Sequence, residues 1–93
     1  MRYEKLKVDG DTIIDEKQIN IILEKNDMHW LIDSEIENAD IEIIKKTLIW
    51  HGGNYYTGNA HYIIFEDGFF SANFTNGIFV KGVFTGKFIT GIK

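Results

Sequence analysis

The chain has 93 residues, of which 44% are hydrophobic, 14% aromatic and 26% charged, and its formal net charge is −4. This size and composition predict a single folded, soluble domain over residues 1–93 and exclude a disordered chain. The absence of cysteine excludes disulfides and thiolate metal sites. No apolar stretch is long enough to cross a bilayer, and the first residues do not resemble a leader, so we expect a cytoplasmic protein without a membrane partner.

Charge is distributed unevenly along the chain. The first 44 residues carry five Lys or Arg against twelve Asp or Glu, whereas the remainder carries five lysines against two acidic residues. An acidic half can meet a basic partner surface, although a solvated face that keeps a β-rich protein in solution is the simpler explanation. Because the basic half contains no arginine, direct binding to nucleic acid is not expected.

The N-terminal region, residues 1–33, is predicted to form short strands or a cap. Residues 4–14 favour two strands around Asp9-Gly10, because glycine readily adopts the positive φ of a tight hairpin turn. Residues 12–25 are ambiguous between strand and helix.

Two patterns compete in residues 12–25. Ile19, Ile22 and Leu23 have helical spacing, and Thr12 with Asp15 could form a capping box. The many β-branched isoleucines and the turn residues that follow at 25–27 favour strands. We predict strands here, with one short helix over residues 15–24 as the alternative.

The second half of the chain has a period of about five residues. Aromatic residues recur at this spacing, with slips of one residue near Phe70 and near Phe88, and glycine follows three residues behind most of them. The recurring positions are Trp50, Tyr55, Ala60, Phe65, Phe70, Phe74, Phe79, Phe84 and Phe88.

Shorter blocks of the same length place a small residue first and an apolar residue third. The clearest are Ala39 to Ile43 and Ala72 to Asn76. In these blocks the chain resembles the pentapeptide-repeat family, and the predicted repeat region extends over residues 34–93. A weaker resemblance, through Gly58 to His61 and the later Asp-Gly and Asn-Gly pairs, is to MORN repeats.

A five-residue period requires regular bends in the chain. In a straight strand, residues five apart point to opposite faces and cannot share one core. A chain that bends in every unit places each aromatic residue inward and a glycine at a corner. We therefore predict an all-β fold, a short-strand β-solenoid as the pentapeptide resemblance also implies, with a β-meander of short hairpins as the alternative.

No pattern typical of catalysis stands out. His29, His51 and His61 lack partners at metal-ligand spacing. Gly52-Gly53 after His51 is interpreted as a turn, and so is Glu66-Asp67. We therefore predict no catalytic residue, no metal site and no cofactor, and a protein that is not an enzyme.

An acidic stripe is the strongest candidate for a functional surface. Asp33, Glu35 and Glu37 alternate along the chain, and Asp40 and Glu42 continue the stripe on the next block. The pentapeptide resemblance implies one role, because some proteins of that family mimic DNA and occupy gyrase. We expect a protein partner that binds this stripe, and hypothesise an inhibitor from a phage or mobile element that acts on a host or defence enzyme that binds nucleic acid.

Self-association is the second functional hypothesis. The repeat continues to Gly91 without a capping helix, and an uncovered coil exposes backbone edges and apolar surface. The sequence therefore predicts a homodimer, or a self-associating structural module, joined through Phe84, Phe88, Ile89 and Ile92.

Overall fold

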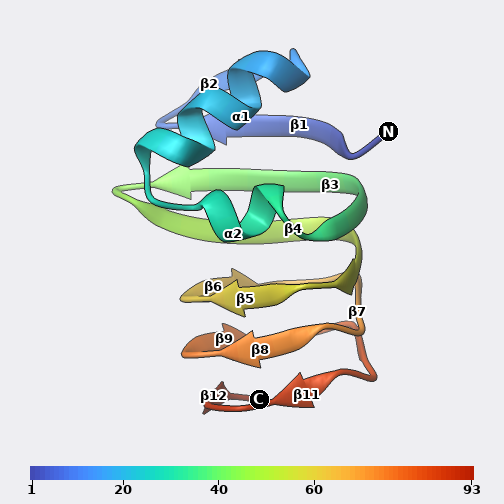
Figure 1. The fold of residues 1–93 in the computed structure, drawn as a ribbon. Coiled ribbons are helices and arrows are strands. Elements are labelled where there is room, and N and C mark those ends of the chain that lie inside the picture. Colours follow the sequence, from blue (N-terminus) through green and yellow to red (C-terminus); the bar gives the residue numbers. More distant parts are fainter.

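The computed structural model describes residues 1–93 and shows a three-sided β-solenoid with two helices at its N-terminal end (Figure 1). The all-β solenoid predicted from the aromatic period is thus confirmed. The elements in chain order are β1 Tyr3–Val8, β2 Asp11–Ile13, α1 Glu16–Lys25, α2 His29–Ile32, β3 Glu35–Ile44, β4 Thr47–Thr57, β5 Asn59–His61, β6 Ile63–Phe65, β7 Phe69–Phe70, β8 Asn73–Thr75, β9 Gly77–Phe79, β10 Val83–Phe84, β11 Lys87–Phe88 and β12 Gly91–Ile92.

Each coil contributes one short strand to each of three sides. The first side holds the start of β4, then β6, β9 and β12, and the second side holds the end of β4, then β7 and β10. The third side holds β5, β8 and β11 in a separate sheet. All these pairings are parallel, as expected for a chain that winds repeatedly in one direction.

The coil length explains the slips in the aromatic period. Phe65 and Phe79, like Phe70 and Phe84, are paired at a separation of 14 residues. The steps between neighbouring inward positions are five residues at two corners of the coil and four residues between the second and third sides, from Phe70 to Phe74. The slips that interrupt the period in the sequence therefore fall at the same corner of successive coils.

The inward aromatic residues form columns along the solenoid. On the first side Phe65 stacks on Trp50 at 5.6 Å and on Phe79 at 5.0 Å between ring centroids, and the rings are tilted by only 15° and 10°. On the second side Phe70 lies 5.3 Å from Phe84 at 7°. Rings from different sides also meet, edge to face between Phe65 and Phe70, Phe70 and Phe74, and Phe79 and Phe84, so the core consists largely of aromatic contacts.

Glycine forms the corner between the first and second sides. Gly53, Gly68 and Gly82 occupy this corner in successive coils with φ of +106°, +116° and +115°. A Cβ atom on Gly68 would lie 2.4 Å from the carbonyl oxygen of Gly53. Only glycine therefore satisfies both the backbone conformation and the close approach of the coils.

Strand β3 differs from the predicted repeat. It runs antiparallel to β4, with Ile36 opposite Tyr55 and Ile41 opposite Trp50. The two isoleucines keep the five-residue spacing and lie on the second and first sides, because the strand bends at Asn38, whose φ is +54°. Residues 34–43 thus line two sides of the core, but the prediction that they form a further unit of the same winding is wrong.

The N-terminal region contains a hairpin and two helices. The predicted hairpin at Asp9-Gly10 is present, since β1 and β2 pair antiparallel. The strands preferred for residues 12–25 are wrong beyond β2, and the alternative helix is correct. Its N-cap is Asp15, whose carboxylate accepts a hydrogen bond from the Gln18 backbone N–H at 3.2 Å rather than forming a box with Thr12.

The helices close the third side where no strand precedes β5. Ile19 and Leu23 of α1 and Leu31 of α2 are fully buried, and α2 lies beside β5 (Figure 1). Burial of this one face outweighs the modest helix propensity of the β-branched isoleucines. Neither helix has the length and apolar character needed to cross a membrane.

Candidate acidic interface

The five residues of the predicted stripe lie at the end of α2 and along β3. We call Asp33, Glu35, Glu37, Asp40 and Glu42 the acidic face. The bend at Asn38 divides it: Glu35 and Glu37 are exposed on the second side, whereas Asp40 and Glu42 are half-buried on the first side. The structure therefore places the five carboxylates around a corner of the solenoid and not on one flat surface.

The Glu35 and Glu37 group is bordered by polar and aromatic side chains of β4. The carboxylate of Glu37 accepts hydrogen bonds from the Tyr56 hydroxyl at 3.3 Å and from the Asn54 amide at 3.4 Å. Tyr56 in turn lies 6.1 Å from the ring of Phe69 in the next coil. This part of the surface combines free carboxylates with aromatic area, as protein-binding surfaces often do.

On the first side, Glu42 of β3 takes part in a bridge that crosses β4 and reaches Glu66, the residue after β6. The His51 ring lies between two carboxylates, with Nε2 2.7 Å from Glu42 and Nδ1 2.9 Å from Glu66. A ring nitrogen that faces a carboxylate must donate a proton, and only the imidazolium ion donates from both nitrogens. The geometry therefore fits a positively charged His51.

The pKa of His51 agrees with this geometry. Partial burial lowers the pKa, but the hydrogen bonds that the ring donates to Glu42 and Glu66 and the nearby charges of Glu66 and Asp40 outweigh burial and raise the pKa above 6.5. The turn expected at Gly52-Gly53, between two aromatic units, is the corner at Gly53, although the strand assignment of β4 continues through it. The sequence signal for the bridge is the separation of 15 residues between His51 and Glu66, which is one coil at this point in the chain.

Asp33 lies apart from the strand, at the C-cap of α2. Its carboxylate is 3.3 Å from His29 Nε2, while His29 Nδ1 is 3.0 Å from Glu24. All three side chains are more than half exposed, so this cluster adds little stability.

No lysine or arginine pairs with the acidic face. The only lysine ion pair within 4.0 Å joins Lys81 to Asp67 in a different part of the solenoid. Lys5 and Lys7 on β1 are in register with Asp40 and Glu42, yet they form no ion pair with them. Glu35 and Glu37 consequently carry negative charge without an ion-pair partner in the chain.

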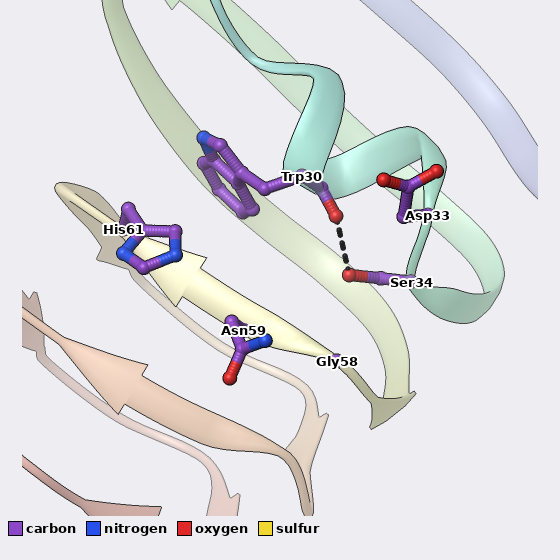
Figure 2. A pocket seen from close by; sticks show the side chains of 6 residues that line it. All are labelled: Trp30, Asp33, Ser34, Gly58, Asn59 and His61. Carbon is purple, nitrogen blue, oxygen red and sulfur yellow. Dashed lines mark hydrogen bonds between the residues drawn. The ribbon is translucent and has the colours of Figure 1, made fainter.

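A small cavity lies between α2 and β5 (Figure 2). It has a volume of about 150 Å³ and is lined by Trp30, Asp33, Ser34, Gly58, Asn59 and His61. Ser34 is part of the wall: its hydroxyl donates to the Trp30 carbonyl oxygen at 2.7 Å and lies 2.6 Å from the buried Tyr55 hydroxyl. A second cavity of about 310 Å³ shares Trp30 and His61.

The histidines are not brought together. His61 packs edge to face on Trp30 at 5.7 Å, His51 lies in the carboxylate bridge and His29 lies on α2. No group of three or more His, Cys, Asp or Glu side chains is arranged to hold a metal ion.

The residues predicted for self-association lie in the last coil. Ile89 and Ile92 are exposed, whereas Phe84 and Phe88 are half-buried, 4.4 Å apart. The ammonium group of Lys93 lies over both rings, at 5.2 Å from Phe84 and 5.9 Å from Phe88. Two of the four residues are therefore partly covered by the chain itself.

Comparison with protein-family models, with curated proteins and with solved structures finds no match to this chain. The fold supports the resemblance to pentapeptide repeats at the level of a repeating β-solenoid, whose coils have three sides and 14 residues, or 15 in the first coil.

Proposed function

We propose that the chain is a non-enzymatic binding protein that occupies a basic surface of another macromolecule through its acidic face. One observation carries this proposal: the carboxylates of β3 have no lysine or arginine partner within the chain. Such charge favours association with a complementary surface and accelerates encounter.

The rigidity of β3 supports the same proposal. The strand is paired on both sides, with β1 and with β4, and Ile36 and Ile41 anchor it in the core. Glu35 and Glu37 are consequently held about 7 Å apart along the strand. Because the backbone that carries them is already ordered, binding costs little backbone conformational entropy. We propose Glu35 and Glu37 as the centre of the contact, because they are the exposed carboxylates of β3.

The proposed partner class is a protein that binds nucleic acid, since such proteins have basic surfaces that an acidic face can occupy. A chain of this kind encoded by a phage or mobile element would act as an inhibitor of a host or defence enzyme. Excess duplex DNA should then compete with the chain for the same partner.

Charge reversal tests the proposal. Immobilised wild-type chain, a Glu35→Lys/Glu37→Lys variant and a matched Glu4→Lys/Glu24→Lys variant are exposed to an extract of the organism that encodes the chain. We expect a protein retained by the wild type and by the matched variant, released by duplex DNA, and lost from the first variant. Equal retention by both variants would contradict a contact at Glu35 and Glu37.

A self-associating structural module is the second candidate function. Half of the ten exposed large hydrophobic residues lie in the last coil: Ile78, Val80, Val83, Ile89 and Ile92. Exposed apolar residues gathered in one region are typical of an interface. Sedimentation at increasing protein concentration tests this candidate.

A further inference from the structure

The two edges of the nine-stranded sheet lie at opposite ends of the solenoid. Strand β2 is the edge strand at the N-terminal end, and β12 is the edge strand at the other end of the same sheet. Both ends are visible in Figure 1, with β2 and α1 at the top and β12 and β11 at the bottom. Each edge strand has hydrogen-bonding groups on one side that no strand of the chain pairs.

The segment that contains β2 is rich in acidic residues, and the nearest basic residues are Lys7, opposite Thr12 on β1, and Lys17 in α1. Residues 9–16 contain Asp9, Asp11, Asp15 and Glu16 and no lysine or arginine. The same segment exposes Ile14, which is 70% accessible. We call residues 9–16 the head surface.

The last coil has the opposite charge. Residues 77–93 contain Lys81, Lys87 and Lys93 and no acidic residue. Exposed apolar side chains occur on each side of this coil, including Val80 at 63% and Val83 at 57%. We call residues 77–93 the tail surface.

We infer that copies of this chain associate head to tail, with the tail surface of one copy against the head surface of the next. This inference rests on the second candidate function, self-association, and specifies its geometry. The acidic head and the basic tail attract each other, whereas two tail surfaces would bring six lysines together. Pairing of β12 with β2 of the next copy would continue the sheet across the contact.

Head-to-tail contact has a different outcome from a closed homodimer. When the tail of one copy binds the head of the next, the next copy's own tail stays free to bind a third copy. The contact is therefore heterologous and can repeat without closing. The weight-average mass should therefore rise continuously with concentration rather than stop at a dimer. Because opposite charges hold the contact, association should weaken when salt shortens the Debye length from about 30 Å at 0.01 M to about 10 Å at 0.1 M.

Sedimentation velocity of two charge-reversed variants tests this arrangement. Asp11→Lys/Glu16→Lys reverses the head, and Lys81→Glu/Lys87→Glu reverses the tail; both leave the N-cap Asp15 and the buried aromatic residues unchanged. At low salt we expect concentration-dependent growth of the wild type and a monomer for each variant alone. When the variants are mixed, growth should return with the two variants in alternation, because the reversed head matches the reversed tail and the two unchanged surfaces match each other. Urea unfolding of each variant verifies that it is folded.

The result for the head variant alone separates the alternatives. If it associates as strongly as the wild type, the head-to-tail arrangement is wrong while self-association stands, as in a dimer joined tail to tail. If the wild type stays monomeric at all concentrations and salts, self-association itself is wrong. Neither result bears on binding through the acidic face.

Discussion

Replacement of Phe70 by alanine should cost the fold about 4 kcal/mol. Phe70 is fully buried and its ring centroid lies 4.8 to 5.3 Å from those of Tyr55, Phe65, Phe74 and Phe84. A Phe to Ala change in a core typically costs about 3 to 5 kcal/mol. The lower end of this range does not apply because β7 is paired with β4 and β10, so the backbone cannot move inward to fill the space.

The loss is large compared with the whole stability of such a domain, which is roughly 5 to 14 kcal/mol for a chain of this length. With a urea m-value of about 2 kcal/mol/M, the midpoint of urea unfolding should fall by about 2 M. Far-UV circular dichroism follows the transition. If Phe70→Ala does not fold, Phe70→Leu provides a smaller change of about 1 kcal/mol.

Phe88→Ala is the matched control. Phe88 is half-buried in the last coil and contacts fewer layers of the core, so its removal should lower the midpoint by clearly less. Equal shifts for Phe70→Ala and Phe88→Ala, or an unchanged midpoint for Phe70→Ala, would refute the idea that stacked rings at the middle of the solenoid dominate its stability.

Two further predictions concern the bridge and the glycine corner. The pKa of His51 is raised above 6.5 in the fold, so the protonated ring contributes to the free energy of unfolding fully below pH 6.5. This contribution is lost as the pH rises through the pKa of the folded state. The urea midpoint should therefore fall between pH 6 and pH 9, and His51→Gln should reduce this pH dependence. An unchanged pH profile in the variant would argue against a charged bridge. Gly68→Ala should cost at least about 2 kcal/mol, because of its φ and the approach of Gly53. Gly52→Ala, where a Cβ meets nothing within 4 Å, should change thermal unfolding little, and similar losses at both glycines would contradict the corner's role.

Much of the architecture can be predicted from the aromatic residues because their spacing is a direct consequence of the coil. Residues five apart cannot share a core unless the chain bends between them. A regular series of such bends makes the chain wind into coils. The direction of β3 could not be predicted in this way. Ile36 and Ile41 satisfy the same spacing whichever way the strand runs, and only pairing with β4 fixes its direction.

The helix at residues 16–25 is not favoured by local sequence pattern, because it depends on tertiary contacts. Local propensity counts β-branched isoleucines against a helix, but burial of Ile19 and Leu23 against the rest of the fold decides the outcome. Such tertiary contacts lie outside a single-sequence pattern.

For the acidic face, the alternation of Glu35 and Glu37 correctly predicts that both side chains face outward. The bend at Asn38 separates them from Glu42. The sequence does not predict this bend, because asparagine adopts a positive φ only in some contexts. The His51 bridge depends on the coil length, which becomes visible only when residues about one coil apart are compared.

The coil of 14 residues also limits how this protein can change in length. Loss or gain of one residue within a strand turns the following side chains of that strand from the core toward solvent, because alternate residues face opposite ways. The corner between the second and third sides accepts one residue more, since Tyr55 and Ala60 are five residues apart and Phe70 and Phe74 four, and all four are buried. Removal or duplication of a whole coil keeps each ring above its equivalent, as Phe79 lies above Phe65. Changes in length among descendants of this sequence should therefore occur as whole coils or as single residues at that corner, and not within the strands.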